Sequence, residues 1–372
     1  MSSTPILQFR HLVLGTAALA VFSMQGQGTS GEETQLERGR ALFDKAFSIP
    51  EGLGSPDING DSCRACHQDP VLGGAGPIEV NVTRFARDNG GAGPFENLAG
   101  GQILSKLRVP TTHGREEYET TGLAAADVFE QRQTPSILGD GLIDQIPGAV
   151  ITSNEDVNDA DNDGIFGVAR RLEIGGVIEI GRFGWKAQVP RLSDFVDDAM
   201  GGELGLTSPD NGRGFALLSD GDAVADPEVS QAVVEDVAFF IEQLPAPERA
   251  GSSDPRVADG LSAFAEVGCA KCHTPSLPSP MGPVPLYSNL LLHNVMPADF
   301  RGMEEPGAGV GFFRTPPLWG IRDTAPYMHD GRAEDLRGAI LAHFGEADQV
   351  RMAFETLSPE RQEALLLFLE DL

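Results

Sequence analysis

Basic residues are scarce in this chain. Its 372 residues include 27 lysines and arginines against 55 aspartates and glutamates, which gives a formal net charge of −28. This balance excludes nucleic acid or an anionic membrane as a natural partner, because both attract positive charge. It favours solubility outside the cell, and it would attract a basic protein such as a small, positively charged cytochrome.

Long apolar runs are also missing once the N-terminus is passed, so no membrane span is expected after it. The chain begins with Arg10 and His11, an apolar stretch from Leu12 to Met24, and then small and polar residues. This layout is typical of a signal peptide, with a retained N-terminal anchor as the competing interpretation. We predict a signal peptide over residues 1–28 and export, most simply to the periplasm.

Cysteine is scarce too, and the few cysteines present are all placed alike. The four cysteines fall in two copies of one pattern, "CRACH" and "CAKCH". Four thiolates on zinc, a redox dithiol, or disulfides would each leave the adjacent histidines without a role. Covalent haem c explains every position: Cys63 and Cys66, or Cys269 and Cys272, bind the vinyl groups, and His67 or His273 binds the iron. The sequence therefore predicts two covalently bound haem c groups.

Other segments are repeated as well, which indicates an old duplication. "GRALF" (39–43) resembles "GLSAF" (260–264), and "RQTPSILG" (132–139) resembles "FRTPPLWG" (313–320). Apolar periodicity predicts a helix over 227–244.

The helix over 227–244 is followed by a Pro-, Gly- and Ser-rich breaker, which we interpret as a domain boundary. We predict a mainly α fold with two tandem cytochrome-c-like haem domains, residues 29–250 and 251–372. Long loops and a small β-hairpin insertion within 170–185 complete this expectation. A final helix is predicted after Ser358 and Pro359, which suit the cap and first turn.

Taken together, these motifs resemble one superfamily. The chain is similar to bacterial di-haem cytochrome c peroxidases and to their relatives that mature methylamine dehydrogenase. It resembles still more closely the di-haem oxidoreductases, also called thiol oxidoreductases. The matching segments cover most of the mature chain: "RGRALF", "CRACH", "RQTPSILGDGLIDQIP", "DADNDG", "GRFGWKAQ", "LYSNLLLH", "RTPPLWGIRDTAPYMHDGRA" and "AILAHFGEA".

The resemblance implies a sixth ligand for the second haem. In the peroxidases this ligand lies on the helix after the HDG motif, and the matching position here is His343. A helix expected over 334–343 would place Leu336, Ile340 and His343 on one face. We predict that His273 and His343 both bind this iron, with Met328 as the alternative. His329 and Asp330 would shape the haem edge or its propionates, or would simply form a turn.

The resemblance also implies that the first haem is the peroxidatic one, with an open distal side and a carboxylate or histidine that moves protons there. Candidates are Asp144, which we favour, Glu155 and Asp156. His113 is an outside possibility as a distal ligand, although its polar surroundings favour a surface position.

Two further features carry weaker predictions. Trp185 and Trp319 are the only tryptophans, and either could serve electron transfer between the haems or simply pack in the core. Asp159, Asp161 and Asp163 alternate before a glycine as in a calcium loop, although Arg170 stands where an EF-hand has glutamate. Calcium and a solvent-exposed acidic turn both remain open.

The sequence thus predicts a di-haem oxidoreductase enzyme of the peroxidase kind. It would take electrons at the C-terminal haem from a soluble donor such as a small cytochrome, and reduce peroxide or another small oxidant at the N-terminal haem. One alternative is an electron carrier without substrate turnover, and another is an oxidase of a partner protein or thiol.

Overall fold

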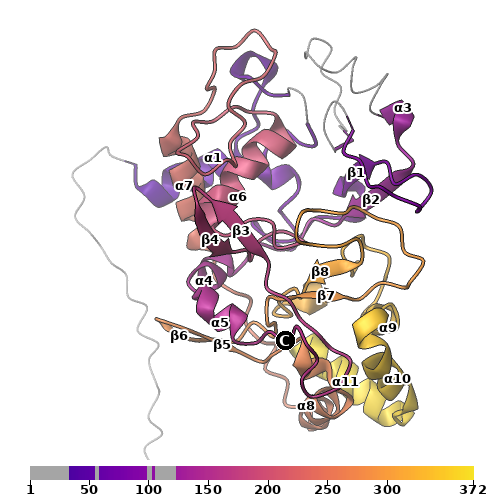
Figure 1. Ribbon diagram of the computed structural model, residues 1–372. Helices are drawn as coiled ribbons and strands as arrows, with labels where there is room; N and C mark the ends of the chain where they lie inside the picture. Colours follow the sequence, from indigo (N-terminus) through magenta and orange to yellow (C-terminus); the bar gives the residue numbers. More distant parts are fainter. Residues whose placement is uncertain (1–32, 55–57, 99–102, 105–122) are drawn as a thin grey trace, which may run out of the picture. The chain divides into compact units, whose positions relative to one another are not determined.

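The computed structural model describes residues 33–54, 58–98, 103–104 and 123–372, and Thr34–Leu372 forms one compact unit. The predicted signal peptide and His113 lie outside the described residues. The described part is helix-rich with small sheets (Figure 1). Its helices are α1 Gln35–Asp44, α3 Leu123–Ala125, α4 Asp140–Asp144, α5 Gly148–Thr152, α6 Leu192–Ala199, α7 Gln231–Glu242, α8 Arg256–Val267, α9 Leu336–Leu341, α10 Asp348–Thr356 and α11 Pro359–Asp371.

Within the described residues, the strands form four separate antiparallel pairs rather than one sheet. One of them, β3 with β4, is a hairpin within the segment where the sequence predicts one. The pairs are β1 Val82–Ala86 with β2 Val128–Arg132, β3 Arg171–Ile174 with β4 Val177–Ile180, β5 Leu277–Ser279 with β6 Gly282–Val284, and β7 Leu292–Asn294 with β8 Phe312–Arg314.

Two helix pairs give the molecule its framework: α1 packs on α7, and α8 packs on α11 (Figure 1). In both pairs a glycine sits where the helices touch. A Cβ on Gly39 would lie 2.0 Å from the backbone oxygen of Asp236, and one on Gly260 would lie 1.9 Å from that of Ala364. Only glycine therefore permits either crossing.

The residue four places after each of these glycines is a buried phenylalanine, and its neighbours repeat as well. Phe43 lies 5.3 Å from Phe240 and 6.5 Å from His67, measured between ring centroids. Phe264 lies 5.3 Å from Phe368 and 6.5 Å from His273. The repeated sequence motifs thus build the same packing around each CxxCH histidine. The division into domains at residue 250 stays a prediction.

Local sequence explains how these helices begin and end. Thr34 and Glu37 form a reciprocal capping box at the start of α1, and Ser358 caps α11 with Pro359 in its first turn. Gly268, at φ 103°, ends α8 immediately before the second CxxCH motif. The predicted helix over 334–343 is shorter than expected, because α9 ends at Leu341.

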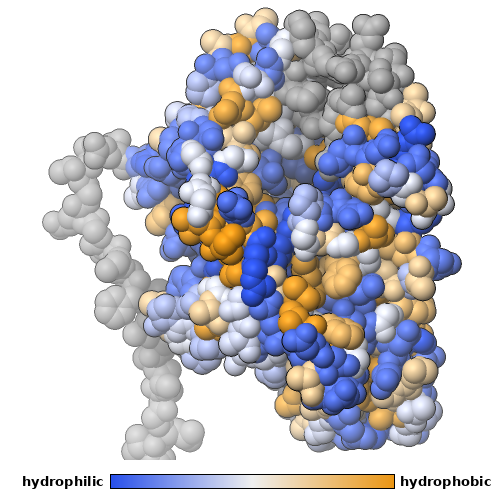
Figure 2. Space-filling model, in the orientation of Figure 1, coloured by the Kyte–Doolittle hydropathy of each residue, from blue (hydrophilic) through white to orange (hydrophobic). Residues whose placement is uncertain are grey.

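The surface agrees with the composition. Hydrophilic residues cover most of the face in Figure 2, and an apolar patch lies over the β3–β4 hairpin, where Val177 and Ile178 are exposed. Within the described ranges, every helix is too short or too polar to cross a membrane.

Candidate functional site

Both CxxCH motifs open into one cavity of about 580 Å³. Each motif begins with a single 3-10 turn, Cys63–Ala65 or Cys269–Lys271. Side chains three residues apart in such a turn lie on the same side, which suits two thiols that bind one group. The cavity wall includes all four cysteines, both motif histidines and His343.

The first motif is held by its own backbone. The side chain of Ser62 accepts a hydrogen bond from the amide of Ala65 at 3.2 Å, and the amide of His67 donates to the carbonyl of Cys63 at 3.0 Å. Burial lowers the pKa of His67 to about 4. The imidazole is therefore neutral at physiological pH, as an iron ligand must be.

In the second half, two histidines are fixed in the same manner. His273 Nδ1 lies 3.0 Å from the carbonyl oxygen of Tyr287, and His343 Nδ1 lies 2.7 Å from that of Ala339. A carbonyl can only accept, so each Nδ1 carries the proton and each Nε2 keeps its lone pair. Burial, with a further contribution from His343, lowers the pKa of His273 to about 3, and burial also lowers the pKa of His343.

These observations argue against disulfides and against one zinc ion shared by the four cysteines. All four cysteines are free thiols. Among the described residues, the clusters with metal-binding geometry consist of carboxylates, so the four thiols do not converge on one zinc ion. Two thiols and a neutral imidazole at each motif, facing a shared cavity, suit one haem at each motif.

The acidic residues singled out in the sequence lie away from this cavity. Asp144 faces a separate hollow with Arg182 and Arg191, and its Oδ1 accepts from the amide of Leu192 at 3.2 Å. Burial raises the pKa of Asp144. Glu155 pairs with Arg171 at 2.7 Å.

The predicted calcium ligands are split by the structure. Asp159 and Asp161 form a carboxylate group together with Asp156, whereas Asp163 pairs with Lys271 of the second CxxCH motif. Calcium at this loop stays a prediction.

Asp198, at the end of α6, is a cavity residue that the sequence did not single out. Its side chain is solvent-exposed and lines the cavity. Desolvation raises its pKa to about 6 against the opposing effect of Arg84. A carboxyl group with this pKa can both take up and release a proton near neutral pH. No local motif marks Asp198; an acidic residue on a helix that lines the cavity is recognisable only after folding.

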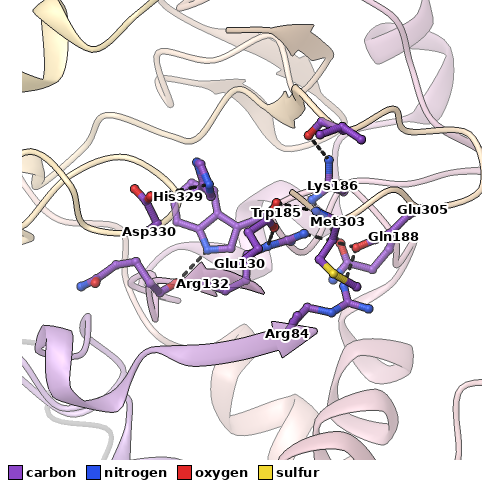
Figure 3. A network of polar contacts seen from close by, with 12 residues as sticks. Arg84, Glu130, Arg132, Trp185, Lys186, Gln188, Met303, Glu305, His329 and Asp330 are labelled. Atoms are coloured by element: carbon purple, nitrogen blue, oxygen red, sulfur yellow. Dashed lines mark hydrogen bonds and ion pairs between the residues drawn. The ribbon is translucent and has the colours of Figure 1, made fainter. Parts of the chain in front are cut away.

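A buried ionic network forms another part of the wall (Figure 3). Glu305 accepts from Arg84 at 2.5 Å and from Arg170 at 2.9 Å, while Arg132 pairs with Glu130. Burial would raise the pKa of Glu305, but these arginines outweigh it and lower the pKa to about 2. Sequence reasoning missed this network, because its members come from four distant segments.

The remaining buried histidines differ in their surroundings. His293 Nδ1 lies 2.9 Å from Glu346, and its Nε2 lies 3.0 Å from the amide nitrogen of Asn289. His329 stacks on Phe313 with ring centroids 3.9 Å apart, and its Nε2 is 3.9 Å from the nearer carboxylate oxygen of Asp330. Both histidines line the cavity.

Both tryptophans and Met328 also line the cavity. Trp185 Nε1 donates to the carbonyl of Gln133 at 2.7 Å, and the carbonyl of Trp185 accepts from the amide of Arg314 at 2.8 Å. Trp185 therefore joins the two repeated segments, 132–139 and 313–320. Trp319 packs in the larger hydrophobic cluster.

Comparison with known proteins identifies one family. The family described as "Di-haem oxidoreductase, putative peroxidase" matches residues 112–372. No curated protein matches the chain.

Likeness to solved structures is low. The di-haem peroxidase BthA from Burkholderia thailandensis is 14% identical with a TM-score of 0.45, over 92% of this chain and 86% of that one. Hydrazine synthase from Kuenenia stuttgartiensis is 16% identical with a TM-score of 0.42, over 98% and 100%. A MauG-like protein associated with microbial copper homeostasis is 20% identical with a TM-score of 0.29, and the match spans 38% of this chain and 56% of that protein.

Proposed function

Because the chain belongs to the family of di-haem oxidoreductases, we propose that it is an exported di-haem c-type cytochrome that works as a peroxidase. Electrons enter at the second haem from a soluble donor and are used to reduce peroxide at the first. The observation that carries this proposal is the asymmetry of the two halves. The second CxxCH motif has His343 fixed with its Nε2 free, whereas the part of the chain that the structure describes offers no matching histidine for the first, and His113 lies outside that part.

The residues that would hold the cofactors follow from the cavity wall. Cys63, Cys66 and His67 hold one haem, and Cys269, Cys272 and His273 hold the other. When bound, haem supplies the one-electron and peroxide chemistry that no side chain offers. The fixed Nδ1–H bonds of His273 and His343 orient both rings and raise their basicity as ligands.

Asp198 is the residue to which we assign proton movement at the first haem. It opens onto the cavity, and its pKa of about 6 means that both its protonated and ionised forms are populated near neutral pH. It would take a proton from one peroxide oxygen and pass it to the other, which leaves as water. Asp144 has no such position in the described structure.

The net charge of the protein indicates what kind of electron donor it would bind. A protein of net charge −28 attracts a basic donor and speeds its encounter, which suits a small positively charged cytochrome. The layout of residues 1–28 supports export to the periplasm, where such donors would be met.

Steady-state turnover of the purified di-haem protein tests this function. Hydrogen peroxide is supplied together with a reduced, basic c-type cytochrome, and oxidation of the cytochrome is followed. We expect turnover that saturates with peroxide and weakens as salt rises, because salt screens the attraction between the proteins. Oxidation of a thiol or partner protein without peroxide turnover would instead support the oxidase alternative.

A further inference from the structure

One arginine of the ionic network, Arg132, lines the cavity and has a guanidinium nitrogen without a hydrogen bond in the described part of the chain. The Arg132 side chain is 7% exposed, and its Nε pairs with Glu130. Its Nη2 makes no hydrogen bond among the described residues and lies 3.5 Å from Glu305 Oε1. A buried guanidinium nitrogen without a hydrogen bond is costly, so a partner from outside the protein is expected.

His329 also has buried nitrogens without hydrogen-bond partners in the part that the structure describes. Its side chain is 2% exposed, and neither ring nitrogen has a hydrogen-bond partner among the described residues. His329 stacks on Phe313, and the Arg132 guanidinium lies 5.6 Å from the centroid of the same phenylalanine. Figure 3 shows Arg132, Trp185 and His329 in one cluster, and the charge of Arg132 contributes to the lowered pKa of His329, after the larger effect of burial.

The local charge selects the kind of partner. The network contains Arg84, Arg132 and Arg170 against Glu130 and Glu305, an excess of positive charge. A guanidinium offers donors only, and the protonated nitrogen of His329 offers another. An anion with two oxygens, such as a carboxylate, fits donors arranged in this way.

Backbone contacts tie this corner to the first CxxCH motif. The amide of Gln133 donates to the carbonyl of His329 at 2.6 Å, and Gln133 Nε2 donates to the carbonyl of Gly76, also at 2.6 Å. Gly76 in turn lies against Cys66, since a Cβ there would be 2.5 Å from the backbone oxygen of Cys66. Cys63 and Cys66 would hold a haem by its vinyl edge, and Arg132 and His329 line the same cavity, so the opposite edge, which carries the propionate carboxylates, would face that cavity wall.

We propose that Arg132 and His329 form a carboxylate-binding site in the cavity wall, and that a propionate of the first haem occupies it. The site depends on the proposed haem attachment but not on peroxide turnover. It would fix the orientation of that haem and keep the propionate ionised. A soluble carboxylate substrate would offer the same chemistry, and the experiment separates these two sources.

Resonance Raman spectroscopy of the di-haem protein provides the test, through the propionate bending modes. Arg132→Gln removes the charge and shortens the side chain, and His329→Phe removes a donor while keeping the stacking on Phe313. We expect both variants to shift a propionate mode of the first haem, and His329→Gln, which keeps a donor, to restore it in part. Arg301→Gln, which removes an exposed arginine paired with Asp88, is the matched control and leaves the spectrum unchanged.

The second arm uses acetate as the probe. Saturable changes in the wild-type absorption spectrum on acetate addition, lost in Arg132→Gln and His329→Phe without any propionate shift, would assign the site to a soluble carboxylate. If haem is attached at both motifs and neither arm responds, the proposed site is wrong. Absence of haem at Cys63 and Cys66, seen by mass spectrometry, would instead contradict the cofactor assignment. Arg132→Lys, which keeps the charge beside Glu130, replaces Arg132→Gln if the latter does not fold.

Discussion

Single hydrogen bonds decide which histidine nitrogens can bind metal in this protein. His273 and His343 each direct Nδ1 at a backbone carbonyl, so the opposite nitrogen is free on both. Because Ala339 lies four residues before His343, this bond survives even though α9 ends at Leu341. The tautomer of the proposed sixth ligand is therefore set by its own local backbone.

His343→Ala should remove the sixth ligand from the second haem. We expect the low-spin signal of that haem to be replaced by a high-spin one, and His343→Met to keep six ligands but raise the reduction potential. Electron paramagnetic resonance and a spectroscopic redox titration measure these changes. Met352→Ala, which alters an exposed residue of α10, is the control. An unchanged low-spin signal in His343→Ala would exclude this ligand and favour Met328.

Asp198→Asn should slow peroxide reduction by roughly 10²-fold or more, since a positioned acid–base group typically contributes that much. The wild-type rate should change with pH near 6, where Asp198 titrates, and the variant should lose this change. Steady-state rates between pH 5 and 8 provide the measurement. Asp144→Asn tests the competing assignment, and Asp254→Asn, at an exposed pair with Arg256, is the control. Equal rates in wild type and Asp198→Asn would show that Asp198 does not move the proton, and a slower Asp144→Asn would then assign this role to Asp144.

At the scale of helices, glycine permits the two crossings that position the CxxCH motifs. Gly39 and Gly260 occupy equivalent places in α1 and α8, and each is followed four residues later by the phenylalanine beside the motif histidine. The two halves therefore share one packing arrangement, and equivalent substitutions in α1 and α8 should destabilise the protein to a similar extent.

Gly39→Ala and Gly260→Ala should each destabilise the protein by about 1 to 3 kcal/mol or more, because the added methyl group overlaps the facing backbone. The matched control is Ser262→Ala, on the exposed face of α8, with an expected change within about 0.5 kcal/mol. Chemical denaturation followed by circular dichroism measures the difference. Wild-type stability in either glycine variant would show that the helices can separate without cost.

Sequence predicted the elements whose signals are local. The repeated "GRALF" and "GLSAF" segments, the α7 helix, the Ser358 cap and the β3–β4 pairing all depend on residues close together in the chain. The length of α9 and the β1–β2, β5–β6 and β7–β8 pairs were not anticipated. β1 and β2, for example, are joined by more than 40 residues, and their register depends on contacts that no short pattern encodes.

The candidate site was predictable to a similar extent. The CxxCH residues were singled out by their motif and His343 by the resemblance to the peroxidases, and all of them line the cavity. Asp198, Arg84 and Glu305 reach the cavity from segments distant in sequence, and only tertiary packing assembles them. Asp144 was preferred because it follows "RQTPSILG" closely in sequence. In the structure, however, Asp144 lines a different hollow.

At the scale of the whole molecule, Glu305 joins distant parts of the chain. It binds Arg84 on β1, lies 3.5 Å from Arg132 on β2, and binds Arg170 just before β3. A buried carboxylate with several arginines holds these segments together, and removing it leaves their charges unpaired.

Glu305→Gln should therefore cost about 3 to 5 kcal/mol at neutral pH. Above about pH 4.5 the carboxylate is ionised in both folded and unfolded chains, so the wild-type advantage is constant. As pH falls from there toward 2, the unfolded chain binds the proton first and the advantage shrinks. Denaturation of both proteins at several pH values measures this. Glu355→Gln, at an exposed pair with Arg351, should change stability by less than about 1 kcal/mol. A difference that stays constant down to pH 2 would contradict the assigned pKa.

The coordination of the two irons tests the central claim most directly. Electron paramagnetic resonance of the oxidised di-haem protein should show one low-spin iron with two histidine ligands, and one high-spin iron that changes when peroxide is added. We expect the high-spin signal to belong to the haem at His67. Two low-spin irons, both indifferent to peroxide, would contradict it and make the protein an electron carrier.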